Sequence, residues 1–161
     1  MSLRTGAPIA TTTSPIINPN NLKIEAFYCA DKFSKDVLVL LAQDVRDVIA
    51  NGLVVNDHDV LSDPKDLIRL KKIIEIDFNL QGKSVQTESG HKVGKVADFA
   101  ADTNTLYVQK LYVSQSLIKS IKSTQLSIDR TQIIEITDRK IVIKDLEDKV
   151  SSRIAITAPA V

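Results

Sequence analysis

The sequence predicts a mainly β protein made of two small antiparallel β units in tandem. Three observations support this prediction: the length of 161 residues allows two very small domains, the apolar residues are mostly Ile, Val and Leu, and the second half repeats the apolar pattern of the first. Hydrophobic residues make up 43% of the chain and aromatic residues 4%. The core must therefore be aliphatic, and β-branched residues favour strands.

The repeat is visible when the chain is compared with itself at an offset of 84 residues. Thr5-Gly6 then aligns with Ser89-Gly90. The apolar pairs are Ile9 with Val93, Leu22 with Leu106, Ile24 with Val108, Phe27 with Leu111, and Tyr28 with Tyr112. From Leu38, which aligns with Leu126, the offset is 88, because the second copy has a longer segment at 114–124. Aligned positions stay apolar while surface positions differ, which indicates a common core geometry.

Within each copy the pattern is that of strands separated by turns. Apolar and polar residues alternate over 92–99 and again over 106–113. Residues 18–21 and 102–105 predict turns at equivalent places, and Ala50-Asn51-Gly52 suits a tight hairpin. Four to six short antiparallel strands per copy make a small barrel or sandwich.

Residues 62–75 are predicted to form a helix that links the copies. Asp63 can cap it, Pro64 suits the first helical position, and apolar residues follow at helical spacing. We expect its apolar stripe to pack on one or both units and to make them one rigid body. The expected organisation is a first unit over 1–61, this linker helix, a second unit over 76–150, and a C-terminal tail over 151–161.

The second copy resembles the PRC-barrel family. The resemblance starts at Leu80-Gln81-Gly82-Lys83-Ser84-Val85 and continues through Ser89-Gly90 and the strand 92–99 to Asp102. It covers nearly all of 80–148 and, through the repeat, 3–61 more faintly. It implies two tandem antiparallel barrels in which Gly82, Gly90, Gly94, Asp98 and Asp102 have structural roles. It also implies docking without catalysis, as in the photosynthetic reaction-centre H subunit and a ribosome-maturation factor.

The first copy departs from this family pattern. Ala10, Ser14 and Pro15 stand where the second copy has glycine, aspartate and phenylalanine. The proline predicts a bulge or an edge strand. The opening strand 80–85 has no counterpart, because the offset places it at or before Met1. We therefore expect an incomplete first barrel unless another segment, such as 153–157, fills the gap, since an exposed sheet edge promotes association.

No constellation of residues predicts catalysis. The two histidines lie far apart in turns and Cys29 lies on an apolar strand, so no pair of nucleophile and base is expected. Gly82-Lys83-Ser84 lacks the glycine that a phosphate-binding loop needs five residues earlier. The run 56–59, with Asp63, offers ligands for a hard cation, but Asp57 aligns with Asp145, which has no adjacent histidine. We expect no enzyme activity, no cofactor and no metal.

The longer segment 114–124 is the candidate partner-binding element. Its apolar residues have helical spacing and alternate with lysines; the candidates are Leu117, Ile118, Lys119, Ile121 and Lys122. Two interpretations remain open. The segment is either a short helix that covers the barrel end or a docking element whose lysines attract an acidic protein or RNA.

Charge and cysteine content limit the partners and the compartment. Basic and acidic residues number 21 and 20, so the chain lacks the field of a protein held mainly by nucleic-acid phosphates. The single cysteine suits the cytoplasm, and the longest apolar run, 37–42, is far shorter than the roughly 20 residues of a membrane span.

The sequence therefore predicts a cytoplasmic, non-enzymatic protein-binding or assembly module. One alternative is an RNA- or ribosome-associated maturation factor, by analogy with the family, and the other is a small-molecule or metal-binding domain.

Overall fold

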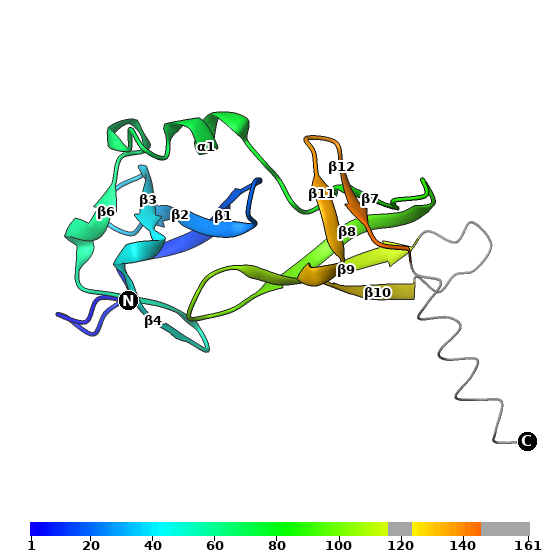
Figure 1. The fold of residues 1–161 in the computed structure, drawn as a ribbon. Helices are drawn as coiled ribbons and strands as arrows, with labels where there is room; N and C mark the ends of the chain where they lie inside the picture. Colours follow the sequence, from blue (N-terminus) through cyan, green and yellow to red (C-terminus); the bar gives the residue numbers. More distant parts are fainter. Residues whose placement is uncertain (116–123, 146–161) are drawn as a thin grey trace, which may run out of the picture. The chain divides into compact units, whose positions relative to one another are not determined.

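The computed structural model describes residues 1–115 and 124–145, which divide into two compact units. Unit 1 comprises Met1–Leu80 and Ala100–Gln109, and unit 2 comprises Gln81–Phe99 and Lys110–Val161. Both units consist mainly of β-strands, and the described residues contain a single α-helix, α1 (Lys71–Ile76) (Figure 1). The mainly β class predicted from the aliphatic, alternating sequence is confirmed.

Unit 1 contains a four-stranded antiparallel sheet and a separate hairpin. The sheet has the order β1-β2-β3-β6, and the hairpin consists of β4 and β5. The strands are β1 (Ala10–Asn18), β2 (Lys23–Asp31), β3 (Val37–Leu41), β4 (Val45–Ile49), β5 (Gly52–Val55) and β6 (Leu61–Ser62). Short 3-10 turns connect some of them: η1 (Ala42–Asp44), η2 (His58–Val60) and η3 (Pro64–Asp66).

Unit 2 contains one continuous sheet of six strands in the order β10-β9-β8-β7-β12-β11. The strands are β7 (Ser84–Thr87), β8 (Lys92–Ala101), β9 (Val108–Gln115), β10 (Thr124–Asp129), β11 (Ile133–Ile136) and β12 (Lys140–Ile143), with η4 (Arg130–Gln132) before β11. β7 runs antiparallel to β8 and parallel to β12. No closed barrel is detected within residues 1–115 and 124–145, so the two barrels expected from the family resemblance remain a proposal.

The two units contain the same order of elements. The series β1, β2, β3, η1, β4, β5 in the first half has the counterpart β8, β9, β10, η4, β11, β12 in the second. The predicted turns agree in detail: the carbonyl of Asn18 accepts from the Leu22 N–H, the carbonyl of Asp102 accepts from the Leu106 N–H, and both distances are 2.8 Å. Both leucines have a left-handed backbone, with φ of 55° and 58°.

The described core of unit 1 includes two aliphatic clusters. The first contains Ile9, Cys29, Leu40 and Val55, and the second contains Ile16, Ala26, Val39 and Leu70. Alternate residues of β2 enter this core, since Ile24 and Ala26 are buried while their neighbours are partly exposed. The alternation of apolar and polar residues that predicts these strands therefore matches the alternation of buried and partly exposed positions.

The segment expected as a linker helix has a different structure. Residues 61–62 form β6, Pro64–Asp66 form a 3-10 turn, and only Lys71–Ile76 are α-helical. The side chain of Asp63 accepts from the Lys65 N–H, so the predicted cap is present, but Leu67 leaves the helical region with ψ of 72°. Leu67, Leu70, Ile73 and Ile74 nevertheless all lie in or against the second core cluster of unit 1, as the predicted apolar stripe requires.

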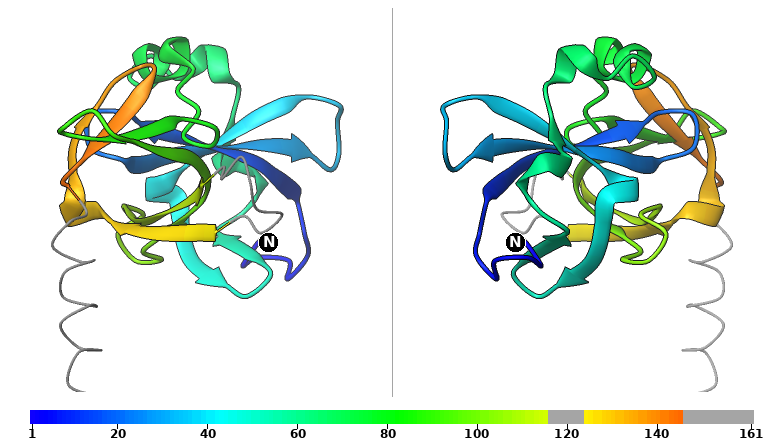
Figure 2. Two further views of the ribbon diagram at one scale, coloured as in Figure 1. Left: turned by 90° about the vertical axis from the view of Figure 1, so that its right-hand side faces the viewer. Right: turned by 90° about the vertical axis from the view of Figure 1, so that its left-hand side faces the viewer.

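β1 has the edge position and the bulges that Pro15 predicts, and the start of the chain lies beside β5. β1 is an edge strand of its sheet, and its register with β2 shifts on both sides of Pro15. Ser2 forms a parallel bridge with Val55, so a short stretch beside β5 is present where the sequence predicted no counterpart of the opening strand. The amino end lies beside the β4–β5 hairpin (Figure 2).

Candidate binding site

The predicted docking residues Leu117, Ile118, Lys119, Ile121 and Lys122 lie outside the described residues. The tail segment 153–157 also lies outside them. The candidate site is therefore built from the parts of the chain that the structure describes.

The family-motif residues have contacts of a structural kind. Gly82 and Gly90 lie in turns with φ of 85° and 88°. Gly94 lies where β8 approaches β9, since a Cβ placed on it would come 2.1 Å from the Ser114 carbonyl oxygen. Asp98 is exposed and accepts from the Phe99 N–H. None of these contacts points to a ligand.

Asp102 organises the turn between β8 and β9. Its Oδ1 accepts from the N–H of Asn104 at 3.0 Å and from both the N–H and the hydroxyl of Thr105 at 2.7 and 2.9 Å. These bonds, led by the Thr105 N–H, lower the pKa of Asp102, because they stabilise the charged carboxylate. The residue therefore holds Asn104–Leu106 in place.

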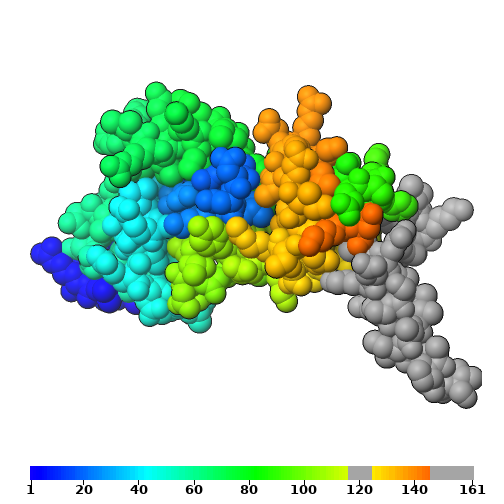
Figure 3. All heavy atoms as spheres, in the orientation of Figure 1, coloured from blue at the N-terminus to red at the C-terminus, as the bar shows by residue number. Residues whose placement is uncertain are grey.

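That turn forms one wall of a hollow of about 700 Å³ in unit 1. The lining comes from four segments: Lys23 and Glu25 on β2, Leu41–Gln43, Asp66–Leu70 with Ile73, and Asn104–Leu106. Figure 3 shows the η3–α1 segment in green, the β3–η1 segment in cyan and the β8–β9 turn in yellow-green at the surface of one face. A hollow of this volume is within the range of small-molecule and cofactor sites.

The hollow has an apolar wall and a polar rim. Leu67, Leu70 and Ile73 form the wall and belong to the second core cluster or pack against it. Ile68, at the rim, is 82% exposed. A single exposed apolar residue is ordinary, but Ile68 lies beside the apolar wall and enlarges the apolar surface that a bound molecule can contact.

Three polar side chains at the rim have no partner within residues 1–115 and 124–145. Gln43, Asp66 and Arg69 line the hollow, are exposed, and make no hydrogen bond or ion pair through their side chains to any residue in these ranges. They can therefore bond to a molecule in the hollow without breaking an existing contact. Lys23 differs, because its Nζ lies 5.7 Å from the centre of the Tyr107 ring.

A smaller hollow of about 160 Å³ adjoins the first. It is lined by Val45–Val48 on β4 and by Thr103, and it shares Ala42, Asn104 and Leu106 with the larger one. A bound chain could therefore extend from the apolar wall toward Arg46 and Asp47, which line the smaller hollow.

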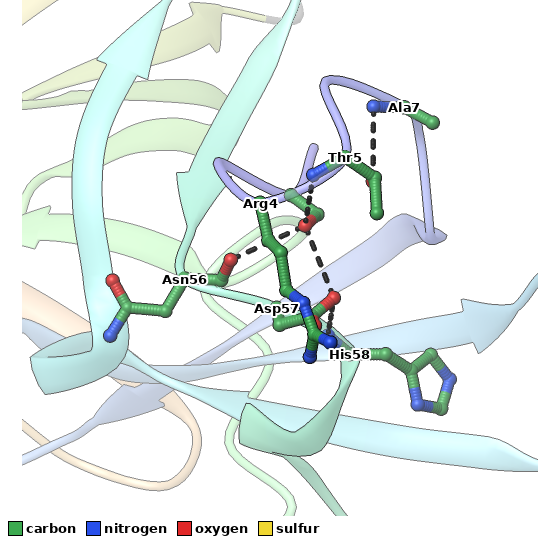
Figure 4. A network of polar contacts seen from close by, with 7 residues as sticks. Arg4, Thr5, Ala7, Asn56, Asp57 and His58 are labelled. Atoms are coloured by element: carbon green, nitrogen blue, oxygen red, sulfur yellow. Dashed lines mark hydrogen bonds and ion pairs between the residues drawn. The ribbon is translucent and has the colours of Figure 1, made fainter.

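The residues considered for a cation form a structural network instead. Asp57 accepts hydrogen bonds from the Ser2 hydroxyl at 3.1 Å, from Arg4 Nη1 at 2.9 Å and from the His58 N–H at 2.8 Å (Figure 4). The His58 N–H is the main cause of the lowered pKa of this carboxyl. Ser2 is fully buried and also bonds to the Asn56 carbonyl, so the network fastens residues 2–5 to the end of β5.

The imidazole of His58 points away from this network (Figure 4). It pairs with Asp31. Nε2 lies 2.8 Å from Oδ1 of Asp31, whose side chain is 4% exposed and also accepts from the Ser34 hydroxyl. The hydrogen bond to His58 is the main reason why the pKa of Asp31 is lowered to about 2. Phe33, which is 70% exposed, packs edge-on against the His58 ring at 5.4 Å.

No group of three or more His, Cys, Asp or Glu side chains converges as a metal site among the residues described. Within the same ranges, no helix has the length and apolar character of a membrane-crossing segment. When the chain is compared with known proteins, no protein-family model matches it and no curated protein is significantly similar to it.

Sequence reasoning missed the hollow. Its rim residues come from segments far apart in the chain, and Ile68 lies within the predicted helix 62–75, at a place where no helix forms. The turns at 18–21 and 102–105 were predicted from the sequence. The bridge between Lys23 and Tyr107, which brings the two turns together, was not. The only sequence signal was the excess of apolar residues over 67–74, which exceeds what one short helix face can bury.

Proposed function

We propose that the protein is a non-enzymatic binding module of the PRC-barrel type, made of two copies of one β unit, and that unit 1 holds a segment of a partner protein. The hollow beside Ile68 carries this proposal. Its apolar wall, its exposed aliphatic rim residue, and the amide, carboxylate and guanidinium groups that have no partner among the described residues fit a polypeptide. The shared order of elements supports the duplication.

The charges around the hollow favour a polypeptide over nucleic acid. Lys23 and Arg69 are balanced by Glu25 and Asp66, so the rim has no net positive field to attract phosphates. A compact small molecule is also disfavoured, because the rim residues Gln43, Asp66, Ile68 and Arg69 are exposed and would leave it largely in water. A polypeptide uses an apolar wall and both signs of charge together.

Affinity capture with the full chain as bait tests this function. The test variants are Ile68→Asp and Arg69→Glu, in the turn before α1. The matched controls are Ile76→Asp and Lys72→Glu, whose residues are exposed on α1 itself and do not line the hollow. We expect to capture a partner protein that remains bound after RNase treatment and that both control variants still bind. Each test variant should weaken binding about tenfold or more, which is the effect of losing a central interface side chain.

Two outcomes contradict the proposal. If the test variants and the controls capture the partner equally well, the hollow is not part of the binding site. Loss of all partners after RNase treatment would favour the alternative of an RNA- or ribosome-associated factor.

A further inference from the structure

The hollow of unit 1 is lined by charges of both signs. Lys23 and Glu25 lie on β2, Asp66 ends η3, and Arg69 lies in the turn before α1. The two charges on β2 already have contacts, one with an aromatic ring and one with a side-chain amide. Asp66 and Arg69 have no side-chain partner within residues 1–115 and 124–145. They are therefore the two charges that a bound molecule can pair with directly.

The backbone that carries Asp66 and Arg69 is fixed on both sides. Before Asp66, the 3-10 turn is capped by Asp63, whose carboxylate accepts from the Lys65 N–H at 2.8 Å. Directly after Arg69, Leu70 is 7% exposed and belongs to the second core cluster. A surface whose backbone is already ordered loses little conformational entropy when a molecule binds to it. The two charges are therefore held in a defined order along the segment.

The surface around these two charges is aliphatic. Leu67 and Ile68 separate them in the chain, and the rest of the apolar lining consists of Leu41, Ala42, Leu70, Ile73 and Leu106. None of the described residues that line the larger or the smaller hollow is aromatic, so the site offers no ring on which a nucleobase could stack. An aliphatic side chain is the group that such a surface buries best.

The charges discriminate by repulsion as well as by attraction. An acidic segment would place a carboxylate near Asp66, and a basic segment would place a cation near Arg69; like charges in contact disfavour binding. An uncharged segment would take water from both side chains and give no ion pair in return. A segment with one acidic and one basic residue satisfies both side chains.

The hollow lies entirely in unit 1. All of its lining residues belong to Met1–Leu80 or Ala100–Gln109. Residues 116–123 and 146–161, which the structure does not describe, are assigned to unit 2. This division favours a separate polypeptide as the occupant.

We propose that the hollow selects a partner segment in which an aliphatic residue lies between an acidic and a basic residue. The aliphatic side chain lies beside Ile68, the carboxylate faces Arg69, and the cation faces Asp66. Asp66 and Arg69 are then the specificity-determining residues of the site. This selectivity rests on the proposed function, because it defines the chemistry of the polypeptide that binds there.

A library of random peptides displayed on phage tests the selectivity, with the full chain as bait. Peptides that bind the wild type but not Ile68→Asp are collected, and their Kd values are measured for a charge-exchanged bait that carries Asp66→Arg with Arg69→Asp. The matched control carries Lys72→Glu with Glu75→Lys. It exchanges two exposed charges at the same spacing on α1, outside the hollow.

We expect the collected peptides to carry an aliphatic residue between charges of opposite sign. The charge-exchanged bait should bind them about fivefold or more weakly than the wild type, because two favourable charge contacts become repulsive, whereas the control should bind them unchanged. Peptides whose acidic and basic residues have been interchanged should prefer the charge-exchanged bait. A bait that had lost its fold could not show this recovery.

Three results would overturn the selectivity. Peptides that require Ile68 but bind the wild-type and charge-exchanged baits equally well would do so and leave the proposed function standing. If no peptide requires Ile68, the proposed function fails as well. The third result is that a synthetic peptide of residues 116–123 or 146–161, or a second copy of the chain, displaces the collected peptides more effectively than they displace one another, because the occupant would then be this chain.

Discussion

Leu22 and Leu106, which are 84 positions apart, have the same left-handed backbone and accept hydrogen bonds from each other's strand. The Val108 N–H donates to the Leu22 carbonyl and the Ile24 N–H donates to the Leu106 carbonyl, both at 2.9 Å. Each leucine follows a turn closed by the preceding Asn18 or Asp102 carbonyl. These two hydrogen bonds explain why Ala100–Gln109 belong to unit 1, although they follow the first residues of unit 2 in the chain.

The positive φ of Leu22 predicts an unusual order of substitutions. Leu22 is 2% exposed, so Leu22→Ala should cost about 3 kcal/mol of unfolding free energy. Leu22→Gly should cost about 1 kcal/mol less than Leu22→Ala, because glycine adopts φ of 55° without strain. Urea unfolding measures both. The extended residue Ile24 is the control, where glycine should be worse than alanine; the same order at both positions would contradict this account.

Asp31 should make stability depend on pH in the acid range. Its folded pKa of about 2 is below the usual value near 3.9, so its contribution is present above about pH 4 and is lost as the pH falls through 2. Thermal unfolding of wild type and Asp31→Asn should therefore differ most at neutral pH and converge toward pH 2. A difference in Tm that stays constant from pH 7 to pH 2 would show that the carboxylate charge is irrelevant.

Gly94 should be the least replaceable glycine of unit 2. Gly94→Ala places a Cβ 2.1 Å from the Ser114 carbonyl oxygen, so β8 and β9 must separate, at a cost of about 3 kcal/mol. Gly90→Ala is the matched control, because its Cβ would meet no atom within 4 Å and only the positive φ costs about 1 kcal/mol. Chemical denaturation compares them. Similar losses of unfolding free energy at both sites would contradict the close approach of Gly94 to the Ser114 carbonyl.

Cys29 should be unreactive in the folded protein. It is 2% exposed in the first core cluster, and burial raises the pKa of its thiol, which disfavours the reactive thiolate. Labelling with a thiol reagent should follow the urea unfolding curve rather than precede it. Rapid labelling in native buffer, with circular dichroism unchanged, would show that the cluster opens locally.

Much of the fold follows from local patterns. Alternation over 92–99 and 106–113, the turns at 18–21 and 102–105, the hairpin at Ala50-Asn51-Gly52 and the edge strand marked by Pro15 all depend on neighbouring residues, and all are present in the structure. The linker helix over 62–75 was only partly right, because Pro64–Asp66 form a 3-10 turn, Leu67 leaves helical geometry and only Lys71–Ile76 are α-helical. Helix propensity is a weak guide, which tertiary context can override.

The sequence by itself determined the mainly β class and the paired turns, since the period of two and the turn residues act over a few positions. Only the tertiary structure decided that Leu22 and Leu106 face each other, that the hollow beside Ile68 joins four distant segments, and that the sheet of unit 1 is divided between β1 and β5. The physical reason is that strand pairing joins residues far apart in the chain, and alternation indicates which face of a strand is buried but not which strand lies beside it.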